Sequence, residues 1–139
     1  MLSADHCTEF SSNFIKRIVE AVQDDSFLVI LHNCGDTDTL VPSMLSTGAG
    51  GLHFGNRCNI VKALGQIPGD TLVFGNIDPV AVFKSGSPES VRSATLQLLQ
   101  ATKGFSNFVL SSGCDVPPHV PLENIDAFFA ALSEFNAGP

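Results

Sequence analysis

Short apolar runs alternate with helix-like segments along the whole chain, and this alternation restricts the possible folds more than any other feature. The apolar runs are bounded by Gly, Pro, Asn or Asp, as is typical of strands, while the longer segments repeat apolar residues three or four positions apart. We expect strands at residues 27–31, 52–54, 71–74 and 108–110, and helices at 8–23, 38–46, 59–64, 87–103 and from 121 onward.

This order predicts an α/β fold of four β/α units with parallel strands, because each connection is long enough for a right-handed crossover. Four units are half of a TIM (β/α)8 barrel, and an open four-stranded sheet is the alternative. At 139 residues we expect one half-barrel-like domain spanning 1–139, a fragment or truncated relative of a longer barrel. Its two open strand edges predict a homo-oligomer or a missing half-barrel partner.

The composition argues against several classes of partner. The net charge is −7 with only seven Lys and Arg, so a nucleic-acid surface is not expected. No apolar run approaches the ~20 residues that cross a membrane, and no signal segment opens the chain, so we expect a cytoplasmic protein. In a reducing cytosol Cys7, Cys34, Cys58 and Cys114 should remain free thiols. The charged fraction is 15%, against about 25% in typical chains, which favours a buried contact with a partner.

Candidate site residues follow the expected strands, where parallel β/α folds carry their active groups. His32 and Cys34 are two positions apart in extended chain, so their side chains point the same way. Cys114 follows the last strand, and a closing sheet can bring it to the same cavity. One imidazole and two thiolates suit zinc, and three ligands leave a fourth position for a substrate thiol, which the metal would hold as a nucleophilic thiolate.

The alternative for this trio is a capped strand end and two buried free thiols. For the remaining residues of these types the structural interpretation is preferred: Cys7 and Cys58 as buried thiols, His53 as a strand residue with a backbone partner, and His6 and His119 as solvent-facing side chains.

Polar residues around the third strand could face a substrate or cofactor. These are Asn76 and Asp78, although Asp78 precedes Pro79 and is at least as well explained as a turn former. Asp36 is expected to cap the helix that follows it.

Several segments of the chain together form a recognisable set: the Phe-rich helix with Lys16-Arg17-Ile18, the His-x-Cys-Gly element at 32–35, and residues 47–49, 75–79, 113–114 and 121–125. In their order and spacing they resemble the carboxyl-terminal half of the uroporphyrinogen decarboxylase superfamily, especially its cobalamin-dependent methyltransferase branch. Members of that branch transfer methyl groups from methylcobalamin to a thiol such as coenzyme M. The resemblance implies that these strands are the second half of a TIM-type barrel.

The same resemblance implies a metal site and its chemistry. In that branch a His-x-Cys pair and a distant Cys bind zinc, and His32, Cys34 and Cys114 match those positions. It implies zinc as a cofactor, a corrinoid as methyl donor, free or on a corrinoid protein, and a small-molecule thiol as acceptor. Many relatives carry an acidic residue where this chain has Gly55-Asn56, so polar support from that position is not expected.

Three functions remain open from the sequence. The chain is a zinc-dependent corrinoid:thiol methyltransferase or the zinc-bearing part of one, a non-catalytic truncated binding or assembly module, or a uroporphyrinogen decarboxylase-like tetrapyrrole-binding protein. The true decarboxylases usually lack the cysteines and use residues of the first half, which is absent here.

Overall fold

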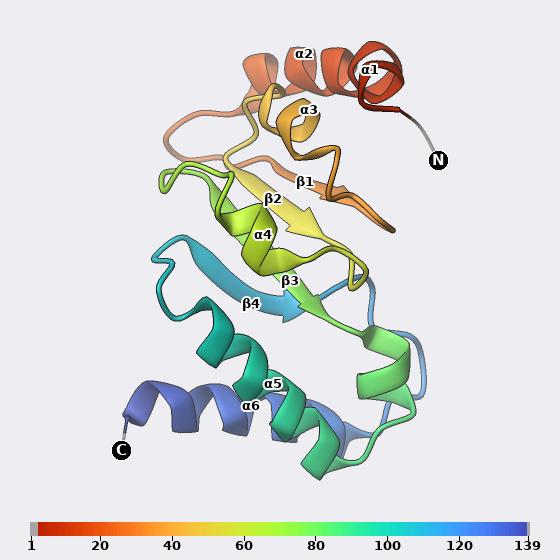
Figure 1. The fold of residues 1–139 in the computed structure, drawn as a ribbon, viewed down its shortest axis with the longest axis vertical. Helices are drawn as coiled ribbons and strands as arrows, with labels where there is room; N and C mark the ends of the chain where they lie inside the picture. Colours follow the sequence, from red (N-terminus) through yellow and green to blue (C-terminus); the bar gives the residue numbers. More distant parts are fainter. Residues whose placement is uncertain (1–2, 139) are drawn as a thin grey trace.

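Helices and strands alternate along the chain in this computed structural model, which describes residues 3–138 (Figure 1). The strands are β1 (Ile30–Asn33), β2 (Gly51–Phe54), β3 (Leu72–Ile77) and β4 (Phe108–Ser112). The helices are α1 (Ala4–Cys7), α2 (Asn13–Val22), α3 (Val41–Leu45), α4 (Ile60–Leu64), α5 (Pro88–Thr102) and α6 (Leu122–Ala137), with π-helical turns η1 (Thr8–Ser12) and η2 (Pro79–Lys84).

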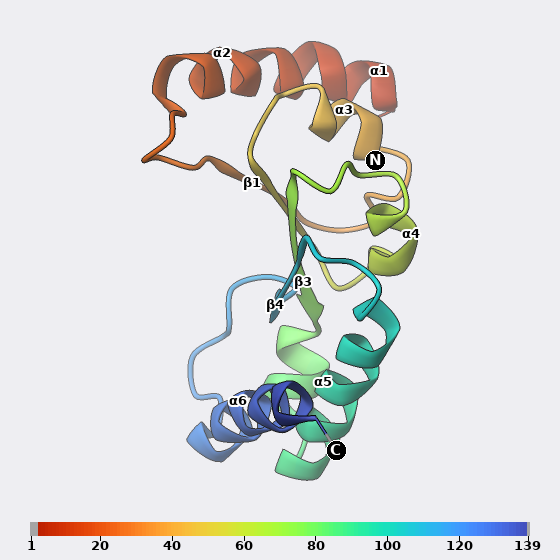
Figure 2. The same ribbon diagram turned by 90° about the vertical axis from the view of Figure 1, so that its left-hand side faces the viewer.

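The four strands form one parallel sheet in the order β1-β2-β3-β4. Figure 2 shows α3, α4 and α5 along one face of the sheet, and among the described residues no helix covers the opposite face. The α/β class and the four parallel β/α units predicted from the sequence are confirmed. All four strands point the same way, so their carboxyl ends meet at one edge of the molecule.

The first strand begins later than predicted. The Asp24 carboxylate accepts hydrogen bonds from the backbone N–H groups of Ser26 and Phe27, which fixes a tight turn that includes Phe27, the first residue of the expected strand. His32 consequently lies inside β1 rather than at its end. The apolar run at 27–31 is also less buried than its composition suggests. Phe27, in the turn, is 56% exposed, and Ile30 is 46% exposed because β1 is an edge strand with an uncovered inner face.

The amino-terminal helix is longer than predicted and runs through α1, η1 and α2 from a Ser3 cap. Its packed side contains Ser12 and Val19, and the Ser12 hydroxyl contacts that of Ser43 in α3 at 2.9 Å. The predicted apolar stripe is present but exposed. Its members, with their exposed fractions, are Phe10 (64%), Phe14 (56%), Ile18 (56%) and Val22 (45%).

Two hydrophobic clusters hold the helices to the sheet. The first contains Leu52, Phe54 and Val73 against α3 and α4, and the second contains Val91 and Phe128, where α5 and α6 meet. Each fully buried side chain of this size contributes roughly 1.5–3 kcal/mol relative to an exposed one. Different helices therefore pack on the two ends of the sheet, α3 and α4 in the first cluster and α5 and α6 in the second.

The last helices follow the predicted starts and stops. Ser87 caps α5 through the backbone N–H of Ser90, with Pro88 in the first turn, and Val91, Thr95 and Leu99 are buried. In α6 the apolar side is incompletely covered, with Phe129 57% exposed. Between residues 3 and 138, none of the helices is both long and apolar enough to span a bilayer.

Candidate metal centre

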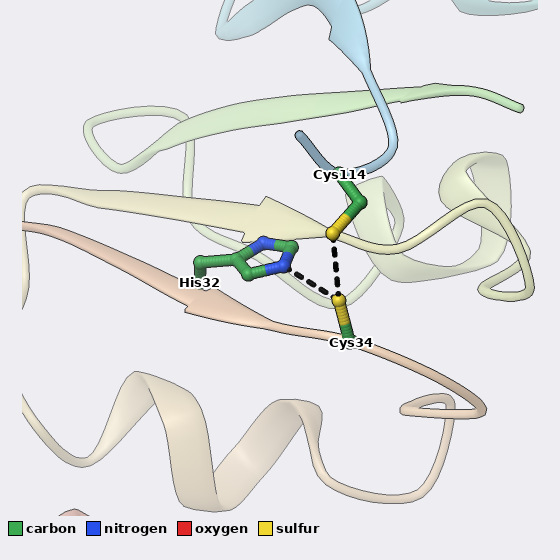
Figure 3. A group of neighbouring side chains, drawn as sticks. All are labelled: His32, Cys34 and Cys114. Carbon is green, nitrogen blue, oxygen red and sulfur yellow. Dashed lines mark hydrogen bonds between the residues drawn. The ribbon is translucent and has the colours of Figure 1, made fainter. Parts of the chain in front are cut away.

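The structure brings together the three side chains that the sequence singled out. His32 lies in β1, Cys34 directly follows that strand, and Cys114 follows β4 (Figure 3). His32 Nε2 is 2.8 Å from Cys34 Sγ, and Cys34 Sγ is 3.2 Å from Cys114 Sγ. These ligand atoms all lie within 4.8 Å of one another. The two sulfurs and the imidazole nitrogen thus face a common point at the rim of the sheet.

Close backbone packing brings the loops after β1, β2 and β4 together. A Cβ on Gly55 would lie 3.0 Å from the backbone nitrogen of Gly35, beside Cys34. A Cβ on Gly113 would lie only 2.5 Å from the backbone nitrogen of Asn56. The 55–56 segment is therefore a platform that the two cysteine-bearing loops approach from opposite sides, and a larger residue at either glycine would push them apart.

The hydrogen bonding of His32 fixes which of its nitrogens is available. Nδ1 lies 3.2 Å from the carbonyl oxygen of His53 on the neighbouring strand. A carbonyl can only accept, so Nδ1 carries the proton and Nε2 keeps its lone pair. Nε2 is the nitrogen that faces Cys34, and the ring is thus oriented as metal-binding imidazoles usually are.

The site favours uncharged side chains when no metal is bound. Burial lowers the pKa of His32, and the neighbouring His53 lowers it further. The hydrogen bond to Cys114 raises the pKa of Cys34, with burial and the charge of Asp115 acting in the same direction. A cation would reverse the preference at Cys34 by stabilising its thiolate.

The donor set fits zinc in chemistry and in spacing. Zinc is borderline soft and is commonly bound by a mixture of Cys sulfur and His nitrogen. A tetrahedral ion would separate two sulfurs by about 3.8 Å and a sulfur and a nitrogen by about 3.6 Å. The observed separations are less than about 1 Å shorter than these. Small side-chain rotations can therefore open the trio around an ion.

A cavity of about 500 Å³ adjoins two of the three side chains. Its lining includes His32 and Cys34 from the rim, Ser11 from the amino-terminal helix, and the charged residues Asp36 and Arg57. The same cavity is also lined by apolar side chains such as Ile15 and Met44, so a small molecule with both polar and apolar parts can reach the same edge of the sheet as the sulfur atoms.

Asn76 and Asp78 are occupied by internal hydrogen bonds. Asn76 Nδ2 donates to the carbonyl oxygens of Gly55 and Cys58, which fastens β3 to the platform segment. The Asp78 carboxylate accepts a hydrogen bond from the Asn56 amide at 2.6 Å and caps η2. These contacts are those expected of a turn-forming residue. The Asp-Pro pair was the sequence signal for that helical turn. A substrate-facing role for either residue remains a prediction.

The other residues of these types lie largely as expected. Cys7 and Cys58 are buried, and burial raises the pKa of Cys58 to about 11. His6 and His119 are exposed. Asp36 does not cap the next helix, because α3 begins only at Val41 and has Leu40 at its cap position.

His53 has a larger role than the sequence indicated. It has the backbone partner that was predicted, with Nε2 lying 2.7 Å from the carbonyl oxygen of Ser112, but that partner is on β4. Its own carbonyl holds His32. The expected strands, 27–31 and 52–54, placed His32 after one strand and His53 within the next, so the sequence did not indicate that the two residues lie opposite each other. The β4 partner could not be found without coordinates either.

A parallel β/α sheet with its polar residues gathered at the carboxyl ends of the strands places this chain in the class of TIM-barrel-related proteins. Within that class, the sequence model of the uroporphyrinogen decarboxylase (URO-D) family matches residues 1–135, and the chain belongs to this family. The resemblance drawn from the sequence motifs is confirmed.

The relatives include two kinds of enzyme. The methylcobamide:CoM methyltransferase MtbA of Methanosarcina mazei is 29% identical over 125 residues, which are 90% of this chain and 35% of the relative. A uroporphyrinogen decarboxylase of Koribacter versatilis is 26% identical over 120 residues, 86% of this chain and 34% of the relative. The chain therefore spans roughly a third of the length of such relatives.

A solved methyltransferase from Methanosarcina mazei has the same fold. It superposes with a TM-score of 0.84 at 24% identity, over 98% of this chain and 39% of the larger one. The partial coverage fits the carboxyl-terminal half predicted from the motifs.

Replacing Gly113 with Ala tests the close packing that forms the site. The new methyl group would clash with the Asn56 backbone, so we expect the free energy of unfolding in urea to fall by about 1–3 kcal/mol. A trivalent arsenical, which bridges neighbouring thiols, should bind the Cys34–Cys114 pair of the variant more weakly than that of the wild type. Gly69→Ala is the matched control, because nothing lies within 4 Å of its added Cβ. Equal behaviour of the two variants would contradict the packing argument.

Proposed function

We propose that this chain is the zinc-bearing part of a methyltransferase that moves a methyl group between a corrinoid and a thiol. The observation that carries the proposal is the convergence of His32 Nε2, Cys34 Sγ and Cys114 Sγ at the rim of the sheet. Three protein ligands leave a fourth position for substrate, which is the arrangement of catalytic rather than structural zinc.

The chain's own residues would prepare the site for a thiol substrate. His32 offers a neutral nitrogen, held in orientation by the His53 carbonyl. Cys34 and Cys114 supply two negative charges on losing their protons to solvent, which would balance a divalent ion. Zinc, when bound, supplies the positive charge that keeps a substrate thiol ionised and so able to accept a methyl group.

The identity of the relatives supports a methyl-transfer function. Besides MtbA, the relatives include a methylated-thiol–coenzyme M methyltransferase of Methanosarcina mazei, 27% identical over 96% of this chain, and the methylcobamide:CoM methyltransferase MtaA of Methanosarcina barkeri. By analogy, a small-molecule thiol and a corrinoid, free or on a corrinoid protein, are the proposed partners. The proposal needs a reducing compartment such as the cytoplasm, because oxidation of the two cysteines would remove both thiolates.

The proposal includes completion of the barrel. As a half-barrel domain spanning 1–139, the chain leaves β1 and β4 as open edges, and the exposed stripe of the amino-terminal helix lies beside one of them. We infer that further β/α units cover these surfaces, supplied by a second copy or by another half barrel.

Two other functions make different predictions. A non-catalytic assembly module would bind zinc without transferring methyl groups, and methyl transfer from methylcobalamin to a thiol by the purified chain alone would exclude it. A decarboxylase-like protein, suggested by the decarboxylases among the relatives, would bind a porphyrinogen, and absence of that binding would exclude it.

Zinc analysis of the purified chain tests the metal site. We expect about one zinc per chain, and loss of that zinc when Cys34 and Cys114 are both replaced with Ala. The matched control is Cys58→Ala, which removes a buried thiol that lies outside the trio and should retain the metal. Unchanged zinc content in the double variant would reject the proposed function.

Zinc affinity should rise with pH. The pKa of Cys34 is raised above its ordinary value of 9.0, so its proton must be displaced by the metal at neutral pH. His32, whose pKa is lowered, is already neutral. The apparent affinity should therefore increase at least about tenfold per unit between roughly pH 7 and 8. Competition with a chelator, corrected for the chelator's own protonation, measures this, and Cys34→Ala should reduce the slope by one proton. A pH-independent affinity would contradict thiolate ligation.

Self-association tests the uncovered helix. We expect light scattering to give a mass above the 14.7 kDa of one chain, and Phe14→Ser combined with Ile18→Ser to lower it, because these changes remove exposed apolar surface. Val61→Ser is the control, since Val61 is exposed on α4, away from the open edges. A well-folded wild-type monomer at high concentration would show that a second copy does not cover this surface.

A further inference from the structure

His53 is not one of the three donor residues, but it contacts both segments of the chain that carry them. His53 is the third residue of β2 and lies directly opposite His32 in the parallel register. The two rings are 4.5 Å apart between centroids, tilted by 43°. The His53 nitrogens are not among the ligand atoms that cluster within 4.8 Å, so its place is beside the trio rather than in it.

The backbone of His53 acts on the first ligand. Its carbonyl oxygen accepts the Nδ1–H of His32 at 3.2 Å, which fixes the ring and leaves Nε2 directed at Cys34. This contact belongs to the main chain and would be retained by any residue at position 53.

The side chain of His53 acts on the last ligand. Its Nε2–H donates to the carbonyl oxygen of Ser112 at 2.7 Å, across the inner face of β3, where the ring of Phe74 lies edge-on at 6.5 Å. Ser112 ends β4, and its hydroxyl donates to the carbonyl oxygen of Cys114 at 2.7 Å. Ser112 therefore joins the two, because its carbonyl oxygen is held by the His53 imidazole and its hydroxyl holds the backbone of Cys114.

We propose that His53 is a positioning residue of the metal centre, whose imidazole N–H holds the end of β4 so that Cys114 faces His32 and Cys34. The inference rests on the proposed zinc site and extends it to a residue that contributes no ligand atom. Neighbouring groups that orient metal ligands typically change metal affinity by about 10–100-fold when removed.

The decisive comparison is between three substitutions at one position. His53→Phe keeps an aromatic ring beside His32 and removes the N–H donor. His53→Gln places an amide N–H near the position of Nε2, whereas the shorter side chain in His53→Asn does not reach it. We expect zinc affinity to fall about 10–100-fold in the Phe and Asn variants and to stay near the wild-type value in the Gln variant.

Cobalt substitution reports which ligand is lost. Thiolate-to-cobalt charge-transfer absorption depends on the number of bound sulfurs, so His53→Phe should lose about half of it. Its spectrum should then match that of Cys114→Ala, because the carbonyl that orients His32 is unchanged. His6→Phe, an exposed histidine far from the site in the sequence, is the control and should match the wild type.

The outcomes separate this inference from the proposed function. If the wild-type chain binds neither zinc nor cobalt, the proposed function and the positioning role of His53 are both wrong. If it binds them and His53→Phe has the same affinity and spectrum, the positioning role is wrong and the zinc site stands. If circular dichroism shows that His53→Phe is unfolded, the comparison of His53→Gln with His53→Asn tests the positioning role instead. Equal zinc affinities for those two variants would show that His53 has no such role.

Discussion

The site depends on the contact between backbones at the carboxyl edge of the sheet. Gly55 and Gly113 have no side chains, and the loops that follow β1 and β4 both pack against the short segment after β2. Cys34 and Cys114 come from strands at opposite ends of the sheet, yet their sulfurs are 3.2 Å apart. The chemistry proposed for this chain therefore rests on Gly113, where a side chain would clash with the backbone of Asn56, and on Gly55, where the backbone of Gly35 leaves little space for one.

The sequence predicted the architecture well, because the signals for it are local. Alternating apolar runs and amphipathic segments gave the four parallel strands, and the Ser87–Pro88 start of α5 matches its observed cap. The trio of His32, Cys34 and Cys114 was also found, through the rule that polar residues after parallel strands share one edge and through the family resemblance.

The errors share a physical cause, which is that burial and hydrogen-bond partners depend on distant parts of the chain. The run at 27–31 has the composition of a buried strand, but it is partly a turn held by Asp24 and partly an uncovered edge. Phe14 and Ile18 repeat with helical spacing, yet they point away from the packed side. The partner of His53 lies on β4, and spacing along the sequence contains no information about such a contact.

The separation of the two cysteines along the chain has a consequence for folding. They are 80 residues apart, so a metal bound by both would close a loop containing most of the protein. Closing such a loop lowers the conformational entropy of the unfolded ensemble, in the manner of a long-range cross-link. The ion would thus link the first strand to the last. It could bind all three side chains only after the chain had been synthesised beyond β4.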